Sequence, residues 1–502
     1  MMIFMTMENN RKIGRQFSLG ELFSGTNAVL SPQSASVRIS GITDDSREIK
    51  VGDLFIAVPG HNIDGRKYIS EAMSLGAAAV LTAPGSDIHA DIPIIFSGDL
   101  KADIAIVADR FFDHPSSKLT VAGITGTNGK TTTTFLLAGI FDSAGKKWGK
   151  IGTIGCDIGG RQVASANTTP GAVNTRRFLA EMLKEKLVGC AMEVSSHALH
   201  QGRSLGIRFS SATFTNLSQD HLDYHKDLDE YFEAKARLFA DVPVSVINID
   251  DPYGRKLISR ASGNVITYGA DKEAEFRYRG VGMTIHGSSL EFEYGQQKLP
   301  FDFPLPGMFN HQNAAAAAAT AVGLGLSLDE AVEGLTKARA VPGRLQPITM
   351  GQPFAVYVDY AHTPDALDKL LASLRLFKPD RLHVVFGCGG DRDRKKRPLM
   401  GKIVSNAADY VYLTSDNPRT EDPKMIIEDA LKGIADRKKC LVIEDRAMAI
   451  KTAISRVSGG DILVIAGKGH EEYQVVGTVK RYFSDVEVAA SELRKLGYGN
   501  SA

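Results

Sequence analysis

The sequence predicts a three-domain α/β protein, and three observations point to this fold class. The chain has 502 residues, whereas one hydrophobic core seldom serves more than about 250–300 residues. From Leu119 onward, apolar strand-like runs alternate with helical stretches, which is typical of a parallel sheet covered by helices on both faces. This alternation stops near Val341-Pro342-Gly343-Arg344 and then starts again. We therefore expect a small N-terminal α/β domain, followed by two larger domains built on parallel sheets.

The first domain is assigned to residues 1–101. It contains short strand-like runs at Asp53–Val58 and Ala78–Thr82, separated by glycine and polar turns. A helical stretch, Ala102–Phe112, then leads to a hinge at His114-Pro115.

The second domain is assigned to residues 102–342 and the third to residues 343–502. Lys130–Ala144 is predicted to be a helix stopped by Gly145, and residues 276–303 alternate as an antiparallel insertion. The alanine-rich stretch Ala314–Leu328 is predicted to be a buried helix rather than a membrane span, and a capping box at Ser327–Glu330 opens another helix. The strands predicted for these two domains are Leu119–Thr125, Val188–Val194, Ala212–Leu217, Val244–Ile249, Ala355–Asp359, Leu382–Gly387, Tyr410–Thr414 and Asp461–Ala466.

The overall charge excludes the function classes that depend on a strong electrostatic field. There are 59 basic and 58 acidic residues, so the net charge is +1, which does not favour binding to nucleic acid or to a membrane surface. The four cysteines are scattered, without the spacing of a zinc site, and indicate reduced thiols in a cytosolic protein. We therefore expect a cytoplasmic protein without a membrane span.

A glycine-rich segment between the first central strand and the next helix predicts a nucleoside triphosphate site. Its sequence, GITGTNGKTT, covers residues 123–132. In this setting backbone N–H groups approach phosphate oxygens, while Lys130 reaches the β- and γ-phosphates and the Thr131 hydroxyl binds Mg²⁺. The spacing departs from the common GxxxxGK[ST] pattern by one residue, and an ordinary βα turn is the alternative. The ATP-binding residues predicted here are Gly126, Thr127, Asn128, Gly129, Lys130, Thr131 and Thr132.

The string GTNGKTT resembles the ATP loop of the Mur ligases and of the related folylpolyglutamate synthetases. The resemblance extends over most of the chain. It implies an N-terminal UDP-substrate-binding domain, a central ATPase of the P-loop type and a C-terminal Rossmann-like domain that binds the amino acid. It also implies a requirement for ATP and Mg²⁺.

The resemblance implies roles for several residues around the nucleotide. Glu193 and His221 would be ligands of catalytic Mg²⁺, although histidine is an unusual ligand for so hard a cation. Lys235, which taken alone is a solvated helix lysine, would be carbamylated by CO₂ and would become a further Mg²⁺ ligand. Together with Lys130 and Arg344, these three residues form the expected catalytic set. Near the nucleotide the family also places Asn310, Asn313, Asp359 and His362, although Asp359 and His362 could instead be a helix cap and an incidental histidine.

The UDP-linked substrate is expected to contact two regions. In Asn167-Thr168-Thr169-Pro170, one amide and two hydroxyls suit sugar and diphosphate oxygens, and the family combines this stretch with Ser195, Gln201 and Arg203. In the first domain, the segments with Ser46, His61 and Asn62 resemble the family's uridine-binding loops, although each alone would be a surface turn.

Three loops that follow strands of the third domain predict the amino-acid substrate. Loops after parallel strands project from one edge of the sheet and can converge on one ligand. Arg392 and Arg419 offer bidentate partners for carboxylates, and Glu471 offers a partner for an ammonium. Diaminopimelate, which carries a second amino-acid head, fits this set, and the string DNPR matches the diaminopimelate-adding branch of the family. The residues predicted to bind it are Arg392, Asp416, Asn417, Pro418, Arg419, Gly467 and Glu471.

The resemblance therefore implies a ligase that adds meso-diaminopimelate to the D-Glu γ-carboxylate of UDP-N-acetylmuramoyl-L-Ala-D-Glu, through an acyl phosphate, in peptidoglycan precursor synthesis. We expect a monomer with these two substrates and ATP as its partners. One alternative is a relative that adds L-lysine, or a folylpolyglutamate synthetase. Another is a P-loop switch or regulatory ATPase, which would have no use for the arginines and the glutamate of the three loops.

Overall fold

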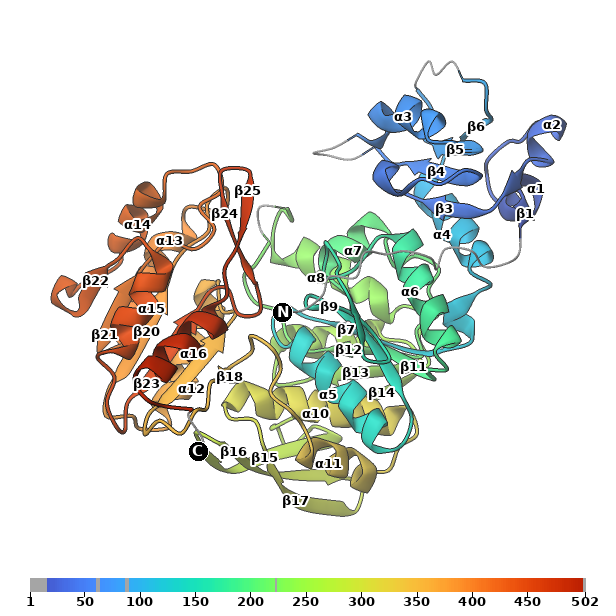
Figure 1. Cartoon of the computed structure of the whole chain (residues 1–502). Coiled ribbons are helices and arrows are strands. Elements are labelled where there is room, and N and C mark those ends of the chain that lie inside the picture. Colours follow the sequence, from blue (N-terminus) through green and yellow to red (C-terminus); the bar gives the residue numbers. More distant parts are fainter. Residues whose placement is uncertain (1–15, 60–63, 86–89, 222–223, 500–502) are drawn as a thin grey trace. The chain divides into compact units, whose positions relative to one another are not determined.

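The structure is a computed structural model, and it describes residues 16–59, 64–85, 90–221 and 224–499. Its elements are labelled in Figure 1. The chain divides into two compact units, which are described separately. Unit 1 comprises Met1–Gly123, Lys146–Ala212 and Arg237–Pro243, and unit 2 comprises Ile124–Gly145, Thr213–Ala236 and Val244–Ala502.

The N-terminal part of unit 1 is a four-stranded parallel sheet with helices on both faces. Its strand order is β3 (Gly41–Thr43), β4 (Asp53–Ala57), β5 (Ala79–Thr82) and β6 (Ile94–Phe96). Successive side chains of β4 point to opposite faces, so Phe55 packs with α3 while Leu54 packs with α1 and α4. The other elements here are β1 (Phe17–Ser18), β2 (Arg38–Ile39), α1 (Leu19–Phe23), α2 (Pro32–Ala35), α3 (Ile69–Ser74) and α4 (Leu100–Phe111).

The rest of unit 1 contains strands that the sequence analysis missed. β8 (Trp148–Gly152) runs parallel to β11 (Gly189–Glu193), and β9 (Gly155–Ile158) and β10 (Arg161–Val163) add antiparallel strands beside it. These three segments are short and rich in glycine and charged residues, so they lack the apolar run by which a buried strand is recognised. Helices α6 (Ala172–Lys184) and α7 (Ser196–Gln201) also belong to unit 1, and β7 (Thr120–Thr125) belongs to it as far as Gly123.

Unit 2 begins with a sheet that changes from parallel to antiparallel. β12 (Ser211–Phe214), which enters unit 2 at Thr213, is followed in order by β13 (Val244–Asn248), β14 (Asn264–Gly269), β15 (Phe276–Thr284), β16 (Gly287–Tyr294) and β17 (Gln297–Phe303). β13, β14 and β15 are parallel, and β15, β16 and β17 are antiparallel, which confirms the predicted insertion. Helices α5 (Lys130–Ser143), α10 (Met308–Gly323) and α11 (Leu328–Thr336) pack together, and α8 (Leu228–Ala236) and α9 (Pro252–Leu257) complete this part.

The predicted single helix over Ala314–Leu328 is wrong at its C-terminal end. α10 ends at Gly323, and Gly325 has φ of +95°, a backbone conformation that glycine adopts far more readily than other residues. α11 begins only at Leu328. The capping box predicted there is present, because the Ser327 hydroxyl accepts from the Glu330 N–H and the Glu330 carboxylate accepts from the Ser327 N–H.

The C-terminal part of unit 2 is a doubly wound sheet. Its strand order is β18 (Gln346–Pro347), β19 (Ala355–Asp359), β23 (Ile462–Ala466), β20 (Leu382–Phe386), β21 (Tyr410–Leu413) and β22 (Cys440–Val442), all parallel except β18. Val464 packs with α12 (Pro364–Arg375), α13 (Lys396–Ala407) and α14 (Pro423–Leu431), whereas its neighbour Ile465 packs with α15 (Arg446–Ile454) and α16 (Asp485–Lys495). The hairpin β24 (Tyr473–Val476) and β25 (Val479–Tyr482) follows β23. The predicted strands of this region are confirmed to within one residue at their ends.

Candidate active site

The glycine-rich loop connects the end of β7 to the start of α5, as predicted. Gly126 has φ of +149°, and a Cβ there would collide with the Thr215 hydroxyl. Gly129 has φ of +86°, and a Cβ there would collide with the amide oxygen of Asn313. The Lys130 ammonium donates to the carbonyls of Gly126 (2.8 Å) and Thr127 (2.9 Å), which curls the loop over the first turn of α5. Both glycines are therefore required by the backbone and by close neighbours.

The segment after β12 supports this loop. The Thr127 and Asn128 N–H groups donate to the carbonyl and side-chain oxygens of Asn216, both at 2.9 Å. The Thr215 hydroxyl donates to the Asn128 carbonyl at 2.6 Å. Sequence reasoning singled out the segment but missed these two residues; the available signal was a polar pair directly after a buried strand.

Arg344 and the two asparagines of α10 lie beside the phosphate loop. The Arg344 guanidinium donates to the Thr131 hydroxyl at 3.1 Å and lies 4.6 Å from the centre of the Tyr360 ring. The Asn313 amide donates to the Asn310 side-chain oxygen at 3.1 Å, and Asn310 in turn donates to a backbone carbonyl in the turn before α10. The structure thus brings Arg344 and Asn313 to the loop, with Asn310 hydrogen-bonded to Asn313.

Asp359 accepts hydrogen bonds from backbone N–H groups, one of them next to Arg344, and does not cap α12. Its two carboxylate oxygens accept from the N–H groups of Leu345 (2.6 Å) and Ala361 (2.7 Å). Burial raises the pKa of Asp359, against the lowering effects of Arg344 and of these two N–H groups. Thr363 is the cap of α12, so the cap alternative for Asp359 is wrong. His362 is exposed and its Nδ1 lies 2.9 Å from the Tyr360 carbonyl.

Lys235 is almost completely buried in unit 2, directly beneath the loop. Its exposed fraction is 1%, its Nζ donates to the Gly126 carbonyl at 2.9 Å, and it lies 4.4 Å from the centre of the Tyr231 ring. Burial, and then the nearby Lys130 charge, hold the pKa of Lys235 well below its usual value, and Asp220 opposes this only in part. This depressed pKa favours the neutral, nucleophilic form of the amine. The prediction of a solvated lysine, which the sequence taken alone would favour, is wrong.

Asp220, His221 and Lys396 form a cluster of charged and titratable side chains near the loop. The pKa of Asp220 is lowered to about 2, because His221, Lys396 and His362 outweigh the raising effect of burial. The Lys396 ammonium lies 3.1 Å from one carboxylate oxygen of Asp220, and the His221 Nε2 lies 3.3 Å from the other. His221 has φ of +54°, which is uncommon for a residue with a side chain. No group of three or more His, Cys, Asp or Glu side chains with metal-binding geometry occurs in the part of the chain that the structure describes.

In unit 1, Glu193 and four of the expected UDP-substrate residues, Thr169, Ser195, Gln201 and Arg203, lie together at the end of β11. The Thr153 N–H and hydroxyl donate to the two oxygens of the buried Glu193 carboxylate, at 2.8 and 3.1 Å. The Thr169 hydroxyl donates to the Glu193 carbonyl at 2.9 Å and accepts from the Ser195 N–H at 3.0 Å. The Arg203 guanidinium, 2.9 Å from the Gln201 side-chain oxygen, donates to the Thr169 carbonyl at 3.0 Å.

The remaining UDP-substrate predictions are more dispersed. The Thr168 hydroxyl lies 3.1 Å from that of Thr153, whereas Asn167 is exposed and its carbonyl accepts from the Ser165 hydroxyl. Ser46 is buried in a single turn after β3. His61 and Asn62 lie outside the described residues.

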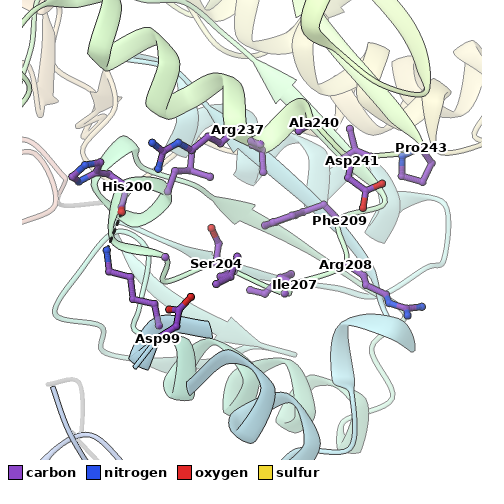
Figure 2. Close-up of a pocket in the computed structure, with 17 residues that line it drawn as sticks. Asp99, His200, Ser204, Ile207, Arg208, Phe209, Arg237, Ala240, Asp241 and Pro243 are labelled. Carbon is purple, nitrogen blue, oxygen red and sulfur yellow. Dashed lines mark hydrogen bonds between the residues drawn. The ribbon is translucent and has the colours of Figure 1, made fainter. Parts of the chain in front are cut away.

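A separate pocket in unit 1 has a volume of about 920 Å³ and is shown in Figure 2. Phe209 and Leu238 form part of its apolar wall, whereas Arg208 and Asp241 are exposed and bring opposite charges to its rim. Of the residues described, none of the predicted site residues lines this pocket. It therefore adds nothing to the site assigned from sequence.

The three loops predicted to bind an amino acid converge in unit 2. They follow the adjacent parallel strands β21, β20 and β23. The Arg419 guanidinium donates to the Gly390 carbonyl at 2.6 Å, and a Cβ on Gly389 would lie 3.1 Å from Arg419 and 3.8 Å from Arg392. The two arginines therefore both lie beside Gly389.

The acidic side of this site is formed by the second and third loops. The Asn417 amide donates to the Glu471 carboxylate at 2.9 Å, and Asp416 lies beside Gly467. Pro418 is buried, and its carbonyl lies against Gly390.

Sequence reasoning missed two buried cations here, Arg397 and Lys468. Arg397 pairs with Glu421 (2.7 Å) and donates to the Gly389 carbonyl (3.3 Å). Their signal was weak, because an isolated Lys or Arg is usually a surface residue.

The fold and the site together define an ATP-dependent ligase, and comparison with known proteins identifies its class. The Mur ligase middle domain matches residues 124–321, the glutamate ligase domain of Mur ligases matches residues 343–469, and the Mur ligase family catalytic domain matches residues 38–109. The chain belongs to the Mur ligase family.

Individual relatives refine this class. The chain is 41% identical to the UDP-N-acetylmuramoyl-L-alanyl-D-glutamate–2,6-diaminopimelate ligase of Clostridium botulinum, over 91% of this chain and 96% of the relative. A solved structure of a ligase with the same name shares 34% identity, has a TM-score of 0.69 and covers 96% of this chain and 100% of its own. MurF ligase from Thermotoga maritima, solved in complex with ADP, shares the fold at 20% identity, with a TM-score of 0.63 and coverage of 91% and 98%. Among the described helices, none combines the length and the apolar character needed to cross a membrane.

Proposed function

We propose that this protein is an ATP-dependent ligase that joins meso-diaminopimelate to the D-Glu γ-carboxylate of UDP-N-acetylmuramoyl-L-Ala-D-Glu, in peptidoglycan precursor synthesis in the cytoplasm. The observation that carries the substrate assignment is that Arg419 and Arg392 both lie beside Gly389, within the same set of loops as the acidic side chain of Glu471. A ligand that pairs with both kinds of charge carries a carboxylate and an ammonium at the end away from the reacting amine. The 41% identical diaminopimelate ligase of Clostridium botulinum supports the same assignment.

The chemistry requires the acid to be activated before the amide bond forms. The D-Glu γ-carboxylate attacks the γ-phosphorus of ATP, which gives an acyl phosphate and ADP. The diaminopimelate amine then attacks the acyl carbon, loses a proton and releases inorganic phosphate. Lys130 and Arg344, which lie around the loop and Thr131, are suited to neutralise charge on the transferred phosphoryl oxygens.

Magnesium is expected at the phosphates, and the available side chains fit it in part. In unit 2, the Thr131 hydroxyl is a hard oxygen donor of the kind that Mg²⁺ prefers, whereas His221 offers a less suitable nitrogen. In unit 1, the Glu193 carboxylate is also a hard oxygen donor. Lys235 would fit only after reaction with CO₂, which replaces its ammonium by a carbamate. The depressed pKa of Lys235 supports this, since only the neutral amine attacks CO₂. When bound, Mg²⁺ would supply charge neutralisation at the phosphoryl oxygens.

Phosphate release from ATP in the presence of Mg²⁺ and UDP-N-acetylmuramoyl-L-Ala-D-Glu tests this proposal. The reaction is run with meso-diaminopimelate, with L-lysine and without an amino acid. We expect turnover with diaminopimelate only. Turnover with lysine would keep the ligase class and overturn the substrate assignment, and turnover without any amino acid would indicate a regulatory ATPase.

A further inference from the structure

Lys468 lies at the centre of the amino-acid loops, yet neither the sequence reasoning nor the proposed reaction uses it. Its exposed fraction is 0%, and lysine is almost never fully buried unless it is paired. Its ammonium lies 3.3 Å from Asp416 Oδ1, 3.2 Å from Asn417 Oδ1 and 3.2 Å from Glu471 Oε2. All three acceptors belong to residues that the sequence predicts to bind the incoming amino acid.

Lys468 and the Val475 backbone together fix how Asn417 and Glu471 are oriented. The Val475 N–H donates to Asn417 Oδ1 at 3.0 Å, and an N–H group can only donate. The amide oxygen must therefore face Val475 and Lys468, which turns the amide nitrogen toward Glu471 Oε2 at 2.9 Å. Glu471 Oε2 thus receives two donors, one from Asn417 and one from Lys468.

The charges of this cluster leave it suited to one further cation. The carboxylates of Asp416 and Glu471 and the ammonium of Lys468 together carry a net charge of minus one. Arg446 lies nearby and is fully buried, but it pairs bidentately with Asp485 at 2.7 and 2.8 Å, and that pair is neutral by itself. A single ammonium from a ligand would therefore balance these three groups, which leaves Arg419 in the same neighbourhood for a ligand carboxylate.

We propose that Lys468 is a positioning residue of the amino-acid site, which holds Asp416, Asn417 and Glu471 in the one arrangement that accepts the distal ammonium of the substrate. This inference rests on the proposed function, because it takes these three residues to be the binding site for diaminopimelate. Lys468 itself does not contact the reacting atoms. Lys468 occupies some of the acceptor atoms of Asp416, Asn417 and Glu471, and the acceptor atoms that remain are left for the ammonium of the ligand.

The test compares two amino acids in two variants. Lys468→Met removes the charge at similar volume, and Lys480→Met is the matched control, because Lys480 is an exposed lysine on β25 whose ammonium lies 3.6 Å from the centre of the same Tyr473 ring that Lys468 approaches at 5.4 Å. KM is measured for meso-diaminopimelate and for 2-aminopimelate, which lacks the distal amino group, with ATP and the UDP-dipeptide saturating. Thermal unfolding and the KM for ATP report whether each variant is folded.

Removal of the Lys468 charge alone would leave the cluster at minus two and would favour an ammonium, so a weaker affinity can come only from lost positioning. We expect Lys468→Met to raise the KM for diaminopimelate about 10- to 100-fold, the effect of losing hydrogen bonds to a charged group, and to change the KM for 2-aminopimelate less than about threefold. The kcat and the KM for ATP should stay within about threefold, and Lys480→Met should change none of these values. An equal rise for both amino acids, or no rise for either, would overturn the inference. So would loss of ATP binding in both Lys468→Met and Lys468→Gln, because Lys468 would then support the fold in general. Absence of turnover with diaminopimelate in the unmodified enzyme would instead contradict the proposed function.

Discussion

Lys235 occupies a position that penalises its own charge, and a residue kept there despite that cost is a candidate for function. Burial and Lys130 depress its pKa, so the folded chain holds fewer protons at this position than the unfolded chain does. Stability therefore rises with pH between the depressed folded pKa and the usual value of about 10.4. Within that window the unfolded state gains from protonation and the folded state does not, whereas below it both states are protonated and stability no longer changes with pH through this group.

We predict that Lys235→Met lowers kcat at least about 100-fold without lowering the melting temperature, because it removes the expected carbamate ligand together with an unfavourable buried amine. The melting temperature of the variant should exceed that of the unmodified protein most at low pH, and the difference should shrink as pH approaches 10. Differential scanning calorimetry from pH 6 to 10 measures this. A variant that is less stable at every pH would show that Lys235 has a structural role only.

Arg419 is a second single residue whose substitution should have a specific effect. We predict that Arg419→Ala raises the KM for diaminopimelate at least about 30-fold, since truncating one member of a desolvated charge pair costs about 2–5 kcal/mol. The KM for ATP should not change. Arg394→Ala is the control, because Arg394 lies on the same loop as Arg392 but is exposed and pairs at 3.4 Å with Asp429. Equal effects of the two substitutions would argue against a direct contact between Arg419 and the substrate.

The residues that could be predicted from sequence are those with a chemically distinctive neighbourhood along the chain. Lys130 stands out because glycines and threonines surround it, and Arg419 because it follows Asp416-Asn417-Pro418. Lys468 could not be assigned in this way. Its importance comes from partners 51 and 52 residues earlier in the chain, and only the structure brings these partners to it.

At the scale of elements, the turn from β7 into α5 depends on Gly126 and Gly129. Gly139, within α5, instead has room for a side chain. We predict that Gly126→Ala abolishes ATP binding, because Gly126 has φ of +149° and an added Cβ would collide with Thr215. Gly139→Ala, within α5 and with no atom near the added Cβ, should raise the free energy of unfolding by about 0.5–1 kcal/mol and leave ATP binding unchanged. Fluorescent-nucleotide titration and urea unfolding check the pair. If ATP binds Gly126→Ala normally, the loop does not hold the phosphates in the way described.

Element prediction was accurate where buried strands are apolar and alternate with helices. β19 begins and ends at the predicted residues, Ala355 and Asp359. β8, β9 and β10 were missed, because their strand conformation depends on pairing with neighbours rather than on an apolar run of their own. The end of α10 was misplaced, because alanine continues a helical pattern up to the point where a glycine conformation interrupts it.

For the whole molecule, the prediction of an ATP-dependent ligase follows from two sheets that each carry loops at the carboxyl ends of their strands. The loops of one sheet are predicted to bind ATP, and those of the other to bind an amino acid. We predict that ATP with Mg²⁺, at 100 times its dissociation constant, raises the free energy of unfolding by about 2.7 kcal/mol. ATP binding should also slow amide hydrogen exchange in α5, which follows the loop in unit 2. An unchanged unfolding transition at millimolar ATP would contradict the assignment of residues 126–132 to the nucleotide.

The central claim is that the chain activates the D-Glu γ-carboxylate as an acyl phosphate and transfers it to diaminopimelate. The most direct measurement is mass spectrometry of a single reaction that contains UDP-N-acetylmuramoyl-L-Ala-D-Glu labelled with ¹⁸O in that carboxylate, together with equal amounts of meso-diaminopimelate and L-lysine. The account predicts a diaminopimelate adduct and inorganic phosphate that has gained one ¹⁸O, since the carboxylate oxygen that attacks phosphorus leaves with it. A lysine adduct, or phosphate without the label, would contradict it.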